Sequence, residues 1–481
     1  MKKFVIVFLF LSIGISVTAQ NKKWTLQECV AYAIENNISV KQSALDVENS
    51  DINKSDALGN YLPTLNASAG NSWNTGLTQD VSTGVLRNIT SRSSSYNISA
   101  GVTVFKGLRN HREMQKAKMQ QLSSQYNLSK IQDDIALYVA NGYLLVLLNK
   151  ANLEVALEQN NVTLDQISRT QELVDAGVLP EGDLLEIRAV SANEKQAIVL
   201  SESAVKISLI SLAQLLLIHD YENFDIANEE FNVILSEITS KNVEEVINSA
   251  KENRYEVKIA EQNMDVAQKD LEISKSFYWP TIDAFFNYNT RETDISRISQ
   301  FTDPDNPIIT TQIGYLGSTG EAVLADVPNT SLISVPALPY GDQLSNNDGI
   351  SYGLQMRVPI FNGFSSRNNI KRNVINVKRS EYQLEQAKLD LESNVYQAYV
   401  DADGSQKAYD AALVALESQE LAYEYAKTKY DVGLTNAFDF SQSKLRYDKA
   451  LIEVNRSKFD YIFKLKVLEL FFGIPATELK F

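Results

Sequence analysis

The chain has 481 residues, 44% of them hydrophobic and 22% charged, a composition that excludes a largely disordered protein. Acidic residues outnumber basic ones by 60 to 45, and the net charge of −15 argues against nucleic acid as a partner, because contacts to a phosphate backbone need a basic surface. The single cysteine, Cys29, excludes an intrachain disulfide and is expected to be a small buried residue of a helix.

The first residues have the pattern of a secretory signal peptide. Lys2 and Lys3 precede a mostly apolar stretch, 4–17, and the small residue Ala19 fits a cleavage site. A membrane anchor is the alternative, but the stretch is short and polar residues follow it at once. We therefore expect residues 1–19 to be a signal peptide. Beyond them, no apolar stretch approaches the ~20 residues of a spanning helix, which leaves a periplasmic protein or an outer-membrane β-barrel.

Two shorter helices and two strands are expected next. Residues 26–36 and 40–58 have the three-and-four spacing of helices. The period then changes to two in residues 65–70 and 97–104, which predicts strands with one apolar face, joined by a polar loop at about 74–95. Barrel strands in a membrane and soluble sheets with one buried face share this alternation, so it does not decide between them.

Two very long helical segments complete the pattern. Residues 108–175 and 364–431 contain no proline, and at ~1.5 Å per residue each predicts a helix of roughly 100 Å. Residues 184–217 and 440–471 are predicted to return as helices, so that each long helix becomes an antiparallel hairpin. Helices of this length are typical of a coiled-coil tube or stalk rather than of a globular domain.

The chain is an internal duplication. Pro63 and Pro280 lie in similar segments 217 residues apart, whereas Phe105 and Phe361 lie in similar segments 256 residues apart. The second spacing then holds for about a hundred residues, which chance matches would not produce. The predicted parts are a first repeat, 20–218, a linker, 219–240, and a second repeat, 241–481, whose 39 additional residues form a long loop at about 290–348.

Two strands per repeat give four per chain, one of them predicted at 352–360 in the second repeat. Four strands cannot close a membrane barrel, because the smallest barrels have about eight and an open edge is not tolerated in lipid. Two chains would supply eight strands and three would supply twelve. The predicted fold class is mixed α and β: a transmembrane β-barrel assembled from several chains and continued by a long α-helical coiled-coil barrel.

These features together resemble the TolC family of outer-membrane efflux proteins. The resemblance covers essentially the whole mature chain and is carried by the duplication, by Tyr61-Leu62-Pro63 with Tyr278-Trp279-Pro280, by the strand ends 105–107 and 361–363, and by the two hairpin tips. It implies a homotrimer with a 12-stranded barrel in outer-membrane lipid and a helical tunnel across the periplasm. It also implies docking onto a periplasmic adaptor protein and an inner-membrane pump of the RND or ABC type.

The resemblance further implies two sets of site residues. Gly177, Val178, Gly433 and Leu434 match the hairpin tips that contact the adaptor. The acidic residues six and nine positions beyond each tip glycine, which narrow the tunnel entrance in the family, are matched by Asp183, Glu186 and Asp439. Gln442 occupies the fourth position, so the usual double ring of aspartates is incomplete. Asp183 and Asp439 also suit a simpler role as N-caps of the returning helices.

The sequence contains no phosphate-binding loop, no metal-ligand spacing and no nucleophile motif, so we expect neither enzymatic activity nor a cofactor or metal. The expected function is passive conduction from an inner-membrane pump across the periplasm and outer membrane. Two other classes remain open: a periplasmic coiled-coil scaffold without a pore, and a surface receptor that uses the loop at 290–348.

Overall fold

The computed structural model describes residues 22–79, 85–229, 231 and 241–475. The predicted signal peptide, 1–19, lies outside these residues, as does part of the predicted linker, 219–240. The chain divides into two compact units. The first comprises residues 1–54, 116–268 and 374–481, and the second comprises residues 55–115 and 269–373.

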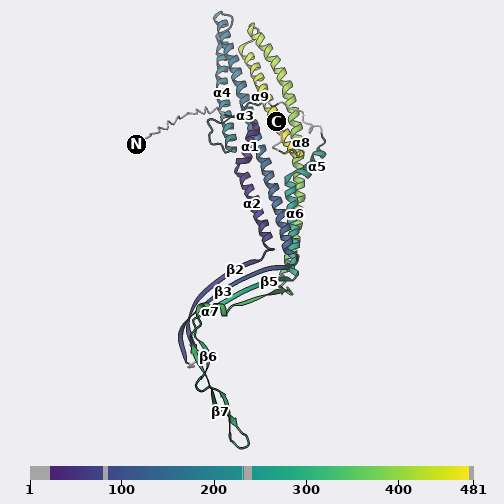
Figure 1. Ribbon diagram of the computed structural model, residues 1–481. Coiled ribbons are helices and arrows are strands. Elements are labelled where there is room, and N and C mark those ends of the chain that lie inside the picture. The colour runs from purple at the N-terminus through teal and green to yellow at the C-terminus, as the bar shows by residue number, and fades with distance from the viewer. Residues whose placement is uncertain (1–21, 80–84, 230, 232–240, 476–481) are drawn as a thin grey trace, which may run out of the picture. The chain divides into compact units, whose positions relative to one another are not determined.

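The helices carry most of the first unit (Figure 1). They are α1 (Leu26–Asn36), α2 (Ile38–Gly59), α3 (Arg109–Asp175), α4 (Glu181–Leu215), α5 (Val243–Asn253), α6 (Tyr255–Lys275), α8 (Ser365–Asp431) and α9 (Ala437–Phe472). Both α3 and α8 have 67 residues, which corresponds to roughly 100 Å of helix. α4 and α9 return along them, in agreement with the two hairpins predicted from the sequence.

The first helix begins at a capping box. Thr25 Oγ1 accepts a hydrogen bond from the Glu28 amide at 3.2 Å, and Glu28 Oε2 accepts one from the Thr25 amide at 3.0 Å. From this start, α1 presents Leu26, Cys29 and Ala33 on one buried face. This face is the part of α1 that packs on the long helices.

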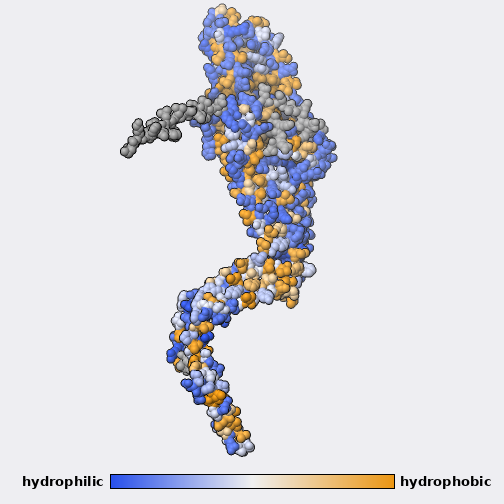
Figure 2. Space-filling model, in the orientation of Figure 1, coloured by the Kyte–Doolittle hydropathy of each residue, from blue (hydrophilic) through white to orange (hydrophobic). Residues whose placement is uncertain are grey.

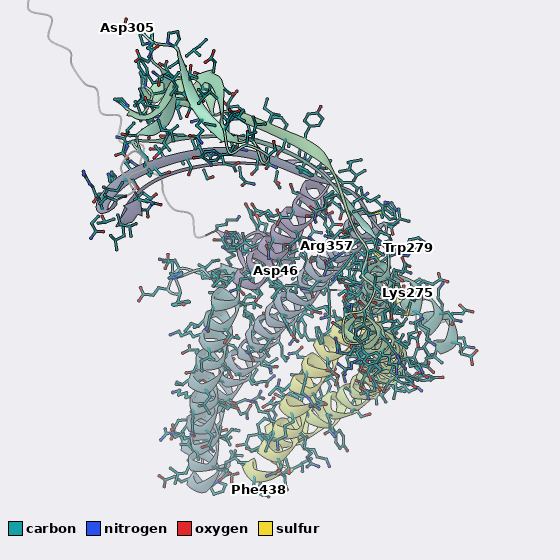
Figure 3. The ribbon with its side chains drawn as sticks, turned by 90° about the horizontal axis from the view of Figure 1, so that it is seen from below. Asp46, Lys275, Trp279, Asp305, Arg357 and Phe438 are labelled. Carbon is teal, nitrogen blue, oxygen red and sulfur yellow. The ribbon has the colours of Figure 1, made fainter. Side chains whose placement is uncertain are left out.

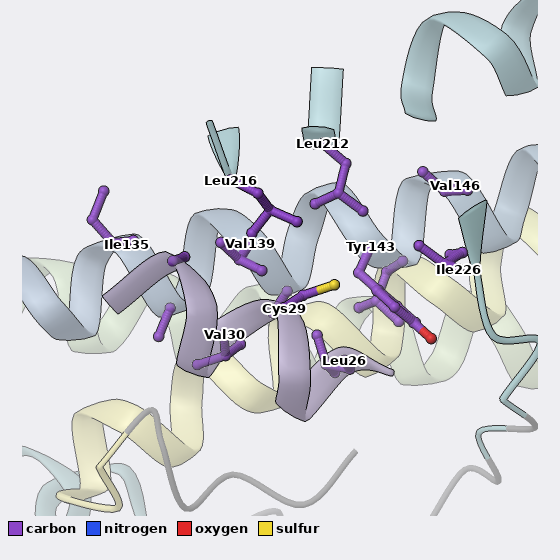
Figure 4. Close-up of a cluster of buried hydrophobic side chains, with 14 of the residues drawn as sticks. Leu26, Cys29, Val30, Ile135, Val139, Tyr143, Val146, Leu212, Leu216 and Ile226 are labelled. Atoms are coloured by element: carbon purple, nitrogen blue, oxygen red, sulfur yellow. The ribbon is translucent and has the colours of Figure 1, made fainter. Parts of the chain in front are cut away.

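A hydrophobic core joins α1 to α3 and α4 (Figure 4). Cys29 and Tyr143 are fully buried in it, so the expectation for Cys29 is confirmed. Burial raises the pKa of the Cys29 thiol to about 12. The buried Tyr143 hydroxyl has a hydrogen-bond partner, because it donates to the carbonyl of Ala227 at 2.9 Å. It thereby holds the short parallel pair of β1 (Lys23–Trp24) and β4 (Asp225–Ile226) against the helices.

A second core joins α5, α8 and α9 at positions equivalent to those of the first. Cys29 and Ala33 correspond to Val246 and Ala250 at a spacing of 217 residues, and all four are buried. At a spacing of 256 residues, the buried residues Ile135, Val139 and Leu212 correspond to the buried residues Leu391, Val395 and Leu468. The repeated spacing is thus also a repeated packing arrangement.

The second unit contains an antiparallel sheet of four strands in the order β10-β5-β3-β2. The strands are β2 (Thr64–Gln79), β3 (Leu86–Lys106), β5 (Thr281–Thr293) and β10 (Gly349–Arg357). β2 pairs with β3 along its whole length, from Thr64 opposite Gly101 to Gln79 opposite Leu86. A tilted strand needs roughly 9–11 residues to cross a bilayer. β2, β3 and β5 exceed this length, and β10, with 9 residues, is at its lower limit.

Two predicted boundaries in this sheet were wrong. The loop expected at 74–95 is largely strand, because β2 continues to Gln79 and β3 begins at Leu86. Polar residues there remain compatible with a strand whose two faces are both exposed. The strand expected at 352–360 ends at Arg357, which lies at the end of β10 in Figure 3. Pro359 explains this end, because it has no N–H to donate to the ladder.

The segment 290–348, expected as a loop, is mostly ordered secondary structure. β6 (Arg297–Thr302) pairs with β9 (Thr330–Val335), and β7 (Ile308–Tyr315) pairs with β8 (Ala322–Pro328). We call residues 297–335 the arm. A short helix, α7 (Tyr340–Asn346), follows it and lies against β5, where the Thr290 hydroxyl donates to the Leu344 carbonyl at 2.7 Å. The Asn, Gly and Pro residues of this segment favoured a loop, whereas the short apolar run at 322–325 is compatible with a strand.

Two helices of the described chain are long and apolar enough to cross a membrane by length and composition, in contrast to the expectation that none would be. They are α3 and α4, and half of the α3 window is buried whereas only 22% of the α4 window is buried. Because α3 carries the first core, its apolar window is explained by packing.

Candidate functional site

The two hairpin tips share one backbone geometry. Gly177 and Gly433 have φ values of +71° and +76°, the left-handed conformation that ends many helices. No heavy atom lies within 4 Å of the place where a Cβ would stand at either glycine. The backbone conformation, rather than lack of space, therefore favours glycine at both positions.

Each tip leaves an apolar side chain in solvent. The Val178 amide donates to the Leu173 carbonyl at 2.8 Å, and the Leu434 amide donates to the Lys429 carbonyl at 2.8 Å. These bonds complete a Schellman motif, which fixes the residue after the glycine. The side chains of Val178 and Leu434 are 62% and 77% exposed. Exposed apolar residues on a fixed turn form a surface that a partner protein can bury.

Of the three predicted entrance carboxylates, Asp183 and Asp439 lie in the first turns of α4 and α9, and Glu186 lies in the second turn of α4. Asp183 is half-buried on α4, whereas Glu186 and Asp439 are exposed. The prediction that Asp183 and Asp439 are N-caps was wrong, because Pro180 and Asn436 hold those positions. Asn436 Oδ1 accepts from the Asp439 amide at 2.8 Å, and both aspartates are instead favoured by the positive end of a helix dipole.

A cluster of aromatic residues holds the two hairpins together near the tips. Tyr430 of α8 stacks on Phe440 of α9 with ring centroids 5.1 Å apart, and both are buried. The Tyr430 hydroxyl lies 3.0 Å from Thr170 Oγ1 of α3. Close by, Arg169 of α3 is 3.3 Å from Asp431 of α8. Burial raises the pKa of Tyr430, so this hydroxyl remains a hydrogen-bonding group at neutral pH.

A buried ionic group, which the sequence analysis missed, links α4 to α9 farther from the tips. Lys444 Nζ lies 2.6 Å from Glu194 Oε1 and 3.3 Å from Asp448 Oδ2, and the Lys444 side chain is 3% exposed. Thr163 and Asn160 of α3 also donate to Glu194, at 2.9 and 3.1 Å. Burial raises the pKa of Asp448 to about 6, a rise that Lys444 opposes and Glu194 assists.

The structure also brings Glu186 and Gln442 together. Both line one cavity between α3, α4 and α9, close to Phe438, which lies near the start of α9 in Figure 3. Asp183 and Asp439 are not among the described residues that line it. A ring of carboxylates therefore does not form within a single chain and would need neighbouring copies.

The helices of the first unit form an open row whose outer members expose apolar stripes. Asp51 of α2 accepts from Gln121 of α3, Ser123 of α3 donates to Asn263 of α6, and Lys388 of α8 pairs with Glu261 of α6. The row is thus α2–α3–α6–α8. Figure 2 shows hydrophobic residues at the surface among hydrophilic ones. At both ends of the row these exposed residues recur every seven positions: Ile38, Leu45 and Ile52 on α2, and Ile375, Tyr382, Leu389 and Tyr396 on α8.

Long helical hairpins, an open four-stranded sheet and exposed helix tips define the class of an outer-membrane channel protein with a helical extension. Residues 30–216 and 246–461 match the model of the outer membrane efflux protein family. The chain belongs to this family, whose members are transport channels of the outer membrane rather than enzymes. It is accordingly a protein of the outer membrane that extends into the periplasm.

Similar proteins agree with this assignment. Outer membrane protein TolC of Vibrio cholerae is 22% identical over 358 residues, which are 73% of this chain and 70% of that protein. Protein CyaE of Bordetella pertussis is 21% identical over 377 residues, which are 78% and 68% of the two chains. The structure of the Campylobacter jejuni CmeC outer membrane channel superposes with a TM-score of 0.73 at 14% identity, over 94% of this chain and 86% of that one.

Proposed function

We propose that three copies of this chain form a passive conduit that serves a tripartite efflux or type I secretion system. The sheets join into a 12-stranded transmembrane β-barrel, and the helical hairpins join into a coiled-coil tube in the periplasm. The tips around Gly177 and Gly433 bind a periplasmic adaptor protein. An inner-membrane pump of the RND or ABC type supplies energy and selects the substrate.

The open edges of the four-stranded sheet carry this proposal. Within the described residues, β2 and β10 each pair on one side only. An unpaired strand edge is not tolerated in lipid, so β2 of one copy pairs with β10 of the next. Two copies would make an eight-stranded barrel, which side chains fill, whereas three leave an open lumen.

The apolar stripes on α2 and α8 support the same closure. Residues spaced by seven positions form the seam of a left-handed coiled coil. The stripe residues are between 44% and 70% exposed in the single chain, although they are large and apolar. Contact between α2 of one copy and α8 of the next buries both stripes and closes the row of helices into a ring.

The entrance carboxylates provide the sharpest test of conduction. In a trimer, three copies of Asp439 face a common axis and attract cations. We expect Asp439→Lys to lower cation preference and to change single-channel conductance in planar bilayers. The control is Glu252→Lys, which makes the same charge change on the exposed surface of α5.

Two results would contradict parts of this proposal. A purified protein that elutes as a monomer and gives no conductance in bilayers would exclude the conduit and favour a scaffold. Conductance that Asp439→Lys leaves unchanged would keep the conduit and exclude the acidic entrance. Mass measurement of the detergent-extracted protein separates three copies from two.

A further inference from the structure

The cavity between α3, α4 and α9 has the dimensions of a small-molecule site. It has a volume of about 400 Å³, which is within the range of pockets that hold small organic ligands. Seven of its sixteen lining residues are apolar, and all three helices contribute some of them, among which are Val155, Ala156, Val190, Phe438, Leu445 and Ile452. The walls are suited to a compact apolar body rather than to a hydrated ion.

Two buried acceptors of this cavity have no hydrogen-bond partner among the described residues. They are Gln159 Oε1 on α3 and Asp448 Oδ1 on α9, and both residues line the cavity. Gln159 is only 9% exposed. A buried acceptor without a partner is costly, so a donor supplied by a ligand is favoured at this place.

The charged side chains that line the cavity leave one negative charge in excess, since Lys444 and Lys449 face Glu186, Glu194 and Asp448. Lys444 carries one positive charge and faces two carboxylates, Glu194 and Asp448. Its ammonium group lies 2.6 Å from Glu194 but 3.3 Å from Asp448, so Asp448 is the less well compensated of the two. Burial raises the pKa of Asp448 to about 6, because Lys444 opposes the rise only in part.

We propose that this cavity binds an organic amine cation with a small apolar body. Because both acceptor atoms are buried, the Gln159 and Asp448 side chains turn toward the cavity and accept from the ammonium group, whose apolar body fills the space between α3, α4 and α9. An anion is excluded by the excess negative charge. A bare metal ion is disfavoured because the described residues contain no group of three or more carboxylate, histidine or cysteine side chains that could hold one.

This site does not depend on the proposed conduit, because it lies within one chain. A bound ligand contacts α3, α4 and α9 at once. It therefore connects α4 to α9, as the Lys444–Glu194 ion pair also does. Binding should therefore raise the thermal stability of the chain, whether or not the assembled protein conducts.

The test uses the full-length protein in amphipol and radiolabelled phenethylamine at pH 8, measured by equilibrium dialysis against protein-free amphipol. We expect saturable binding with about one site per chain and a dissociation constant on the order of 0.1–1 mM, because the ligand is small. Phenethylamine should be displaced by unlabelled phenethylamine but not by 2-phenylethanol, which has the same body without the charge.

Variants locate the site. Asp448→Asn removes the negative charge and Gln159→Leu removes an acceptor, and each should weaken binding about tenfold or more. Ala197→Trp places a large side chain on the α4 wall and should abolish binding. Asp165→Asn, an exposed carboxylate on α3, is the control and should bind as the wild type does. Circular dichroism verifies that each variant is folded.

Three results would overturn the proposal. They are no saturable binding up to about 10 mM, equal displacement by phenethylamine and 2-phenylethanol, or binding that persists in folded Ala197→Trp. Because the competition experiment uses the wild-type chain, it remains decisive even where a variant fails to fold.

Discussion

At the scale of single residues, Asp448 is unusual because it is a largely buried carboxyl group whose negative charge is compensated only in part by Lys444. Its folded-state pKa is raised from 3.8 to about 6. The folded chain therefore binds the proton more tightly than the unfolded chain, and stability falls as pH rises from about 4 to about 6. Above this window, the ionised carboxylate costs up to about 3 kcal/mol per chain.

This cost can be removed by substitution. Asp448→Asn should raise the melting temperature at pH 8 and leave it nearly unchanged at pH 4, because the wild-type carboxyl is already protonated there. Lys444 keeps its closer partner, Glu194, in this variant. The measurement is thermal unfolding between pH 4 and pH 8.

The control for this prediction is Asp403→Asn, whose carboxylate is 53% exposed and pairs with Lys407. Its effect should stay within about 0.5 kcal/mol at every pH, because exposed pairs contribute little. If Asp448→Asn and Asp403→Asn show the same pH dependence, Asp448 is not the group that titrates.

At the scale of elements, the two repeats differ according to the place of each helix in the row. On α2, which lies at the edge, Ile38, Leu45 and Ile52 form an exposed stripe. The equivalent positions of α6, which lies between α3 and α8, are Tyr255, Gln262 and Lys269. Apolar residues spaced by seven positions therefore occur on α2, at the edge of the row, and not at the equivalent positions of α6.

A charge in the α8 stripe tests the seam between copies. Leu389→Glu should prevent assembly, because it places an uncompensated carboxylate in the proposed contact between copies, from which water is excluded. Leu389→Met at the same position keeps an apolar side chain and should assemble normally. Leu45→Glu on α2 should have the same effect as Leu389→Glu. Sedimentation in detergent reports the number of copies, and an assembled Leu389→Glu protein would show that α8 is not at the seam.

The sequence was sufficient for elements whose period is long and uninterrupted. The hairpins of α3 with α4 and α8 with α9 could be predicted because no proline breaks residues 108–175 or 364–431. The caps could not be placed correctly, since Asp183 and Asp439 resemble N-caps as closely as their neighbours do. Asn436, three residues before Asp439, was the available signal.

The buried ionic group and the cavity could not be predicted from the sequence. Lys444 and Asp448 are four residues apart, as many exposed ion pairs on helices are. Only the packing of α9 on α3 and α4 shows that Lys444 is buried and that Glu194, 250 residues earlier, is its partner. Contacts between segments that are distant in the chain cannot be recognised from a local sequence pattern.

At the scale of the whole molecule, the arm belongs to the second unit but lies outside its four-stranded sheet. Among the described residues, its strands pair only with one another, β6 with β9 and β7 with β8. α7, by contrast, is tied to the sheet, because Gln343 Nε2 donates to the Thr293 carbonyl at 2.9 Å. The arm can therefore be removed without cutting the bonds that hold α7.

Replacing residues 297–335 with a short Gly-Ser turn should leave assembly and single-channel conductance unchanged, since no strand of the sheet loses a partner. Conductance in planar bilayers and mass in detergent measure this outcome. Loss of assembly would show that the arms of neighbouring copies join. Loss of ligand capture at the cell surface, with conductance intact, would favour a receptor role.

The exposed stripes on α2 and α8, at the two ends of the row of helices, have a genetic consequence. In the proposed ring, a chain with Leu389→Glu keeps its α2 stripe and can still join a neighbour on that side, but it blocks closure on the other side. If a cell makes equal amounts of intact and altered chains and three are drawn at random, only about one ring in eight contains intact chains alone. A lesion at an edge is then expected to be dominant over the normal copy, whereas a lesion that unfolds the chain before it can join is recessive.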